Sequence, residues 1–171
     1  MAGSQSQAPG TSQRWIPDRY AKNARFVADL GAPLLDMLDP KPGGRLVAEM
    51  GGSGNVASVR RALSTALARR GIAAAAVDPW YFPTPEEYRA RLEARGFIVR
   101  SIALIPRPTP IPGDIAAWIE TFGESFLFAV PDVARAALIA EVAAEVAPML
   151  KSADGRWGVD YVRLRFAALK P

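Results

Sequence analysis

The sequence predicts a single α/β domain built on a small mixed sheet. Its 171 residues are one domain's worth of chain, and half of them are hydrophobic while 22% are charged, which is typical of a globular protein. Three short apolar runs, at 45–50, 97–105 and 159–168, have the composition of β-strands. Helically spaced apolar residues and glycine- or proline-rich turns separate these runs, so strands and helices follow one another along one domain.

The segment before the first strand is expected to hold a tail and two helices. Residues 1–13 are polar and are predicted to be disordered, and they lack the basic start and apolar core of a secretory signal. Apolar residues at 26–30 have helical spacing, and Pro33 suits the first turn of a second short helix. The turn cluster at 39–44 ends that helix.

A glycine-rich turn, Gly-Gly-Ser-Gly at 51–54, follows the strand at 45–50. Asn55 is predicted to be the N-cap of the next helix, which ends at Gly71. A glycine turn between a strand and a helix can bind a phosphate or nucleotide group. It can also be a packing feature, which we favour because the G-x-G-x-x-G spacing and a well-placed acidic residue are missing.

The second half of the chain contains a strong helix signal and several proline breaks. Segment 72–80 is compatible with either a strand or a helix. Thr84-Pro85-Glu86-Glu87 is a capping box with proline at the first helical position, so a helix is expected to start there. The proline-rich segment 107–113 is predicted to be a loop, and amphipathic helices are predicted over 115–127 and 131–150.

The composition excludes several classes of chemistry. The chain has no cysteine and no histidine, which excludes disulfides, thiol nucleophiles, imidazole catalysis and the usual zinc sites, so no metal site is expected. The net charge of +4 comes from scattered basic residues without interleaved aromatic residues, so nucleic-acid binding is not expected. No window approaches the apolar length of a membrane span, and we expect a cytoplasmic protein.

Four segments carry a resemblance to a known family: a tryptophan-tyrosine segment at 15–27, KPGGRLVAEMGGSGN at 41–55, DPWYFPTPEEYRARLEARGFIV at 78–99 and YVRLRFAALKP at 161–171. Together they resemble the class I S-adenosylmethionine-dependent methyltransferases, in the branch of the trans-aconitate methyltransferases. The resemblance implies a Rossmann-like fold in which the last strand lies antiparallel between the other two. It also implies helices on both faces of the sheet, a helical cap at about 114–150, S-adenosylmethionine as cofactor and a small-molecule carboxylate as substrate.

The sequence departs from this family in its first half. Between residues 14 and 45 it lacks segments matching the first four strands, including the glycine-rich cofactor motif and the acidic ribose ligand. An in-frame deletion that joins two similar Pro-Gly turns, with a junction near 42–44, would produce this sequence. We therefore expect a truncated methyltransferase-like domain over 14–171 that is impaired or inactive alone. The alternative is a non-catalytic binding or assembly module, or a dimerising remnant.

The resemblance implies a substrate or cofactor cleft lined by Trp15, Tyr20, Glu49, Asn55, Trp80 and Tyr81. Glu49 is the candidate base, although a glutamate here can also cap backbone amides or pair with an arginine. The tryptophans can equally be packing residues, and Asn55 can be a helix cap.

Arg163 and Arg165 share one face of the last strand, so with Arg107 they can hold a carboxylate or form a solvated face. The strand at 45–50 is apolar on both faces and lacks a lysine, proline or bulge that would protect an edge. We therefore expect a homodimer that pairs through this strand.

Overall fold

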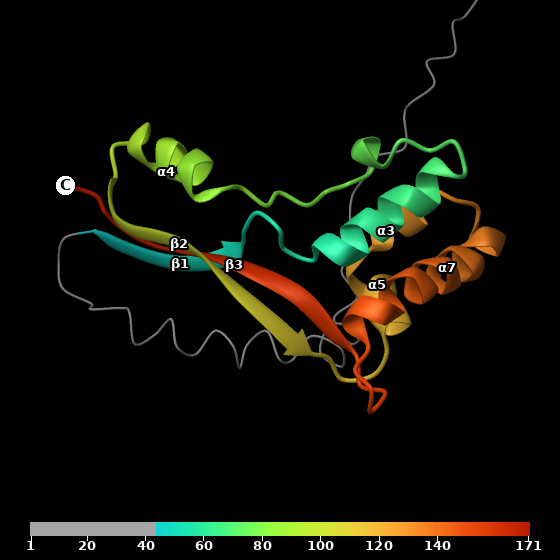
Figure 1. Ribbon diagram of the computed structural model, residues 1–171. Helices are drawn as coiled ribbons and strands as arrows, with labels where there is room; N and C mark the ends of the chain where they lie inside the picture. The colour runs from blue at the N-terminus through green and yellow to red at the C-terminus, as the bar shows by residue number, and fades with distance from the viewer. Residues whose placement is uncertain (1–43) are drawn as a thin grey trace, which may run out of the picture.

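A computed structural model describes residues 44–171, and the structural statements below concern that part of the chain (Figure 1). The tail at 1–13, the two helices expected before residue 39, Trp15 and Tyr20 lie outside the described residues. The elements are β1 (Arg45–Gly51), α3 (Ala57–Ala68), η2 (Ala74–Ala76), α4 (Pro85–Glu93), β2 (Ile98–Pro110), α5 (Ile115–Phe122), α6 (Glu124–Leu127), α7 (Asp132–Leu150) and β3 (Gly158–Leu169).

The three strands form one sheet in the order β1-β3-β2. The last strand, β3, pairs antiparallel with both neighbours, so β1 and β2 run parallel to each other on either side of it. This arrangement confirms the strand order and directions that the family resemblance implied. The three expected strands are all present, and the architecture is α/β.

The strand β2 is longer than the sequence predicts, because the proline-rich segment expected to be a loop continues the strand through Pro110. Its prolines occupy alternate positions, at Pro106, Pro108 and Pro110. The amide of Ile111 donates to the carbonyl of Trp157 (3.0 Å), so the amides at alternate positions before it face β3. The prolines therefore fall on the outward-facing positions of an edge strand, where a missing N–H breaks no hydrogen bond.

The start of α3 also differs from the prediction. Val56, at φ 47°, is the N-cap residue, and its side chain makes no capping bond. The aspartate Asp160 on β3 serves the helix instead, because its Oδ2 accepts from the amide of Ser58 (2.9 Å) and its carbonyl accepts from the amide of Val56 (3.0 Å). The side chain of Asn55 binds β3, so the prediction of Asn55 as the N-cap is wrong.

Helices pack on the sheet at its two ends (Figure 1). Val159 and Tyr161 join the larger core with residues of α3, α5 and α7, whereas Phe166 and Ala168 pack with Leu92 of α4. Side chains alternate along a strand, so these two sets lie on opposite faces of β3. The helix expected over 115–127 is divided at Gly123, and the ambiguous segment 72–80 contains the short helix η2.

The capping box that the sequence predicts is confirmed. The amide of Glu87 donates to Thr84 Oγ1 (3.2 Å), and the amide of Thr84 donates to Glu87 Oε2 (2.9 Å). Across residues 44–171, none of the helices combines the length and the hydropathy that a membrane crossing requires.

Candidate functional site

The carboxyl ends of β1 and β2 and the amino end of β3 meet at one end of the sheet. In the strand register, Gly51 at the end of β1 stands opposite Arg163, and Pro110 at the end of β2 stands opposite Gly158. In open α/β sheets, ligands bind outside the carboxyl ends of the strands. This end of the sheet is therefore the expected position of a functional site.

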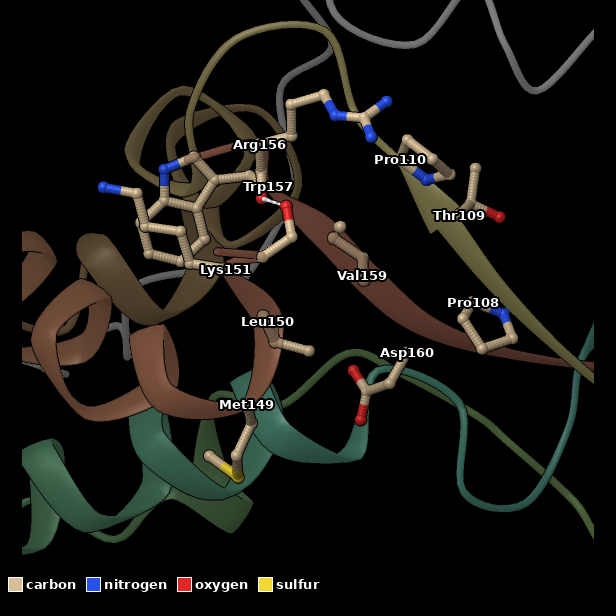
Figure 2. Close-up of a pocket in the computed structure, with 12 residues that line it drawn as sticks. Pro108, Thr109, Pro110, Met149, Leu150, Lys151, Arg156, Trp157, Val159 and Asp160 are labelled. Carbon is tan, nitrogen blue, oxygen red and sulfur yellow. Dashed lines mark hydrogen bonds between the residues drawn. The ribbon is translucent and has the colours of Figure 1, made fainter. Parts of the chain in front are cut away.

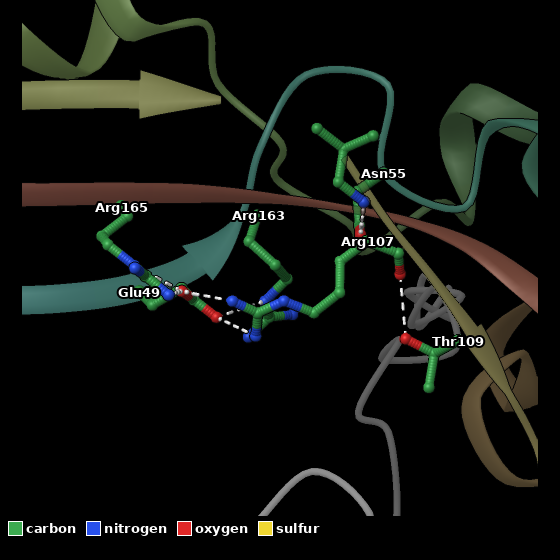
Figure 3. A network of polar contacts seen from close by, with 7 residues as sticks. Glu49, Asn55, Arg107, Thr109, Arg163 and Arg165 are labelled. Atoms are coloured by element: carbon green, nitrogen blue, oxygen red, sulfur yellow. Dashed lines mark hydrogen bonds and ion pairs between the residues drawn. The ribbon is translucent and has the colours of Figure 1, made fainter. Parts of the chain in front are cut away.

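Glu49 is held near this end by three arginines from the two other strands (Figure 3). Its side chain is 2% exposed. Arg107 on β2 donates from both terminal nitrogens, Nη1 to Oε1 (2.8 Å) and Nη2 to Oε2 (3.1 Å). On β3, Arg165 donates from Nε to Oε2 (2.8 Å), and Arg163 donates from Nε to Oε1 (3.3 Å). We call these four residues the Glu49–arginine cluster.

The strand register explains why these side chains meet. Glu49 is paired directly with Arg165 across β1 and β3, and Arg163 lies two residues away on the same face of β3. The prediction that the two β3 arginines share a face is confirmed. The carboxylate that they bind is that of Glu49, so an outside carboxylate would have to compete with it.

The arginines change the acid–base character of Glu49. Burial alone would raise the pKa of this carboxyl group, but the hydrogen bond from Arg165 and the charges of Arg107 and Arg165 hold the pKa below its ordinary value. A carboxylate with a lowered pKa is a weak base, and both of its oxygens are already accepting hydrogen bonds. The geometry thus favours the ion-pair interpretation of Glu49 over a role as general base.

The glycine-rich turn uses its amides within the protein. Gly52 donates to the carbonyl of Val162 (3.0 Å), Ser53 to that of Pro83 (2.9 Å), and Asn55 to that of Gly52 (2.9 Å). A Cβ on Gly52 would lie 2.4 Å from Leu104 Cδ2 and 2.9 Å from Leu164 Cβ, so close packing requires glycine there. These contacts support the packing interpretation of the turn, since amides already bound to carbonyls do not hold a phosphate.

Asn55 and Trp80 serve mainly to join parts of the fold. Asn55 is buried, and its Oδ1 accepts from the amide of Val162 (2.9 Å), which ties the glycine turn to β3. Trp80 packs against Phe82, Trp118 and Phe126, with ring centroids 5.0–6.2 Å apart. Trp80 agrees with the packing alternative that the sequence left open, whereas Asn55 is structural without being the helix cap.

Tyr81 is the most accessible of the described cleft candidates. It is 47% exposed, and the guanidinium of Arg91 lies 5.0 Å from its ring centre. Trp15 and Tyr20 lie outside the described residues, so the predicted cleft as a whole stays a prediction.

Sequence reasoning missed Asp160, which lines a hollow at the same end of the sheet. The signal was present in the alternation of β3. Val162, Leu164, Phe166 and Ala168 share one face of the strand, and Asp160 continues that series as its one charged member. A carboxylate on an otherwise apolar strand face needs either a partner or a function.

One comparison with a known protein supports a methyltransferase-type relationship. The chain is 34% identical, over 138 residues, to a protein of Schizosaccharomyces pombe described as an uncharacterized methyltransferase. The similarity covers 74% of this chain and 50% of that protein, so the chain spans about half the length of the curated relative that it matches. No protein-family model matches the sequence.

Proposed function

We propose that this chain is a methyltransferase-like domain of the S-adenosylmethionine-dependent class I type. The observation that carries the proposal is the strand order β1-β3-β2, with an antiparallel strand between two parallel ones, which is the arrangement that the family resemblance implies for its last three strands. The similarity to the S. pombe protein supports the same class. The trans-aconitate branch and a small carboxylate as methyl acceptor rest on the quoted sequence segments.

The second part of the proposal is that the chain alone is impaired or inactive, because it does not hold the cofactor. The sequence lacks the family's glycine-rich cofactor motif and its acidic ribose ligand. Within the described residues, the glycine turn and Glu49 are the groups that most resemble that motif and that ligand. Both already have partners inside the protein, since the amides of the turn donate to carbonyls and Glu49 accepts from arginines. The deletion near residues 42–44 is our hypothesis for how this arose.

The test is a thermal shift measurement with S-adenosylhomocysteine on the full chain. A ligand at a hundred times its dissociation constant adds about 2.7 kcal/mol to the stability of a protein that binds it. For a domain of this size, that corresponds to a rise of several degrees in Tm. We expect no rise, and a rise of several degrees would overturn the proposal of lost cofactor binding.

The alternative function is a non-catalytic module that assembles as a homodimer through residues 45–50. The observation that favours it is the position of β1, which lies at one edge of the sheet formed by the described strands. Light scattering after size-exclusion chromatography should give twice the monomer mass of 18.4 kDa, and Val47→Lys should restore the monomer mass. A soluble wild-type monomer would refute this dimer.

A further inference from the structure

A hollow of about 490 Å³ lies between the start of β3, the end of β2 and the C-terminal end of α7 (Figure 2). Its walls are mainly apolar and include Pro108, Leu150, Trp157 and Val159. A volume of this size matches small-molecule sites, which combine apolar walls with a few polar groups. The hollow lies beyond the Glu49–arginine cluster and shares no residue with it.

Asp160 supplies the wall of this hollow with an unsatisfied acceptor. One carboxylate oxygen, Oδ2, accepts from the amide of Ser58 (2.9 Å) at the start of α3. The other oxygen, Oδ1, is buried and accepts no hydrogen bond. A buried acceptor without a donor costs about 1–3 kcal/mol, so a donor brought into the hollow has free energy to gain there.

The side chain of Met149 lines the same hollow as Asp160. Met149 and Asp160 both contact Ser58, and Met149 is 50% exposed (Figure 2). An unbranched thioether side chain adapts readily to a neighbouring group. Met149 can therefore adjust its side chain to a ligand that approaches Asp160.

The two cationic residues of the hollow already have partners. The ammonium group of Lys151 lies 5.4 Å from the centre of the Trp157 ring, and Arg156 donates from Nε to Asp154 Oδ2 (2.7 Å). Both side chains are exposed, so water can serve their remaining N–H donors, whereas Asp160 Oδ1 is a buried acceptor without a donor. This distribution favours a ligand that donates hydrogen bonds and carries positive charge over an anionic one.

We infer that this hollow is a binding site for a small amine with a flat apolar body, whose ammonium group donates to Asp160 Oδ1 while its body packs against Trp157, Val159 and Leu150. The site does not depend on the proposed methyltransferase function, since no reacting group is assigned to it.

Phenethylamine is a suitable probe, with phenylacetate as a matched anion of similar size and shape. Both are titrated into the ¹⁵N-labelled full chain at constant pH, and the indole N–H of Trp157 and the amide of Val159 are followed by NMR. We expect phenethylamine to shift both signals with saturation, and phenylacetate to bind at least about tenfold more weakly. Equal or tighter binding of phenylacetate, or no saturable shift with the amine, would overturn the proposal.

Asp160→Asn is the variant that tests the carboxylate itself. Its amide oxygen can still accept from Ser58, so the start of α3 keeps its hydrogen bond while the negative charge is lost. We expect amine binding to weaken at least about tenfold, whereas Asp132→Asn, which removes the same charge at an exposed position outside the hollow, leaves it unchanged. Unchanged binding in Asp160→Asn contradicts the inference. The comparison of the two probes on the unaltered chain stands even if the variant fails to fold.

Discussion

The Glu49–arginine cluster and the hollow beside Asp160 each contain a carboxylate with an oxygen shielded from water, but the two carboxylates differ in how many of their hydrogen bonds are made. Glu49 accepts from three guanidinium groups, and both of its oxygens are occupied. One carboxylate oxygen of Asp160 accepts a hydrogen bond from the first turn of α3, and the other has no donor. The first carboxylate is a structural joint between three strands, and the second has capacity left for a ligand.

This difference shows that the type of a residue does not by itself decide whether it is a site. Glutamate at the end of a strand beside a glycine turn looks catalytic in the sequence, yet its bonding capacity is consumed within the protein. Asp160, which no sequence motif marks as a candidate, has one carboxylate oxygen without a hydrogen bond. The remaining hydrogen-bonding capacity of a buried group is therefore the better guide to function.

The largest expected effect comes from Glu49→Gln. Removing the charge leaves three arginine side chains, each 20–25% exposed, clustered without their shared anion. Breaking a buried ion pair from one side costs about 3 kcal/mol or more, and we expect a loss of this order in the free energy of unfolding from urea denaturation. The control Glu141→Gln, whose partners Arg69 and Arg70 lie nearer to solvent, should lose much less. Equal losses in the two variants would show that the cluster is no more than a surface ion pair.

The pH dependence of stability provides a second measurement on the same cluster. The pKa of Glu49 lies below its ordinary value of 4.5 in the folded chain, so the unfolded chain binds its proton more readily. The stabilisation is present above pH 4.5 and is lost as the pH falls through the folded pKa. The difference in unfolding free energy between wild type and Glu49→Gln should shrink over that window. A difference that stays constant down to the folded pKa would contradict the lowered pKa.

A smaller effect is expected at the glycine turn. The Cβ of Gly52→Ala would meet the side chains of Leu104 and Leu164 at 2.4 and 2.9 Å. Overpacking of this kind costs about 1–3 kcal/mol, and the variant should unfold at a lower urea concentration. Ser53→Ala is the neighbouring control and should keep the wild-type midpoint to within about 0.5 kcal/mol. If Gly52→Ala is as stable as the control, close packing does not require glycine at this position, and the turn is again a candidate ligand-binding loop.

The smallest of these effects belongs to the capping box of α4. Its two hydrogen bonds are satisfied within the protein like those of the Glu49–arginine cluster, but they lie at the surface, where water can replace them. Thr84→Ala should cost about 1 kcal/mol, and Thr84→Ser should restore most of it. The urea midpoints of the three proteins decide this, and an unchanged midpoint in Thr84→Ala would remove the capping box as a source of stability.

The features that the sequence predicts correctly are mostly local. The capping box involves groups three residues apart, so the spacing of Thr84 and Glu87 already contains it. The partners of Glu49 lie 58 to 116 residues away, and periodicity carries no information about such pairings. The strand order came from the resemblance to a family, since three strands alone can be arranged in several ways.

The failures have the same origin. The prolines of β2 predict a loop from the sequence alone. In the sheet they occupy the outward-facing positions of an edge strand, where proline is tolerated. The amide of Ser58 at the start of α3 donates to Asp160, which lies 102 residues away in the sequence. A prediction from neighbouring residues alone therefore assigned the N-cap wrongly to Asn55.

We propose that the chain has the sheet of a methyltransferase-like domain but does not hold the cofactor alone. Isothermal titration of S-adenosylmethionine into the full wild-type chain tests it most directly. We predict no heat of binding beyond dilution. A saturable isotherm with Kd on the order of 1 µM would correspond to about 8 kcal/mol of binding free energy and would contradict the claim.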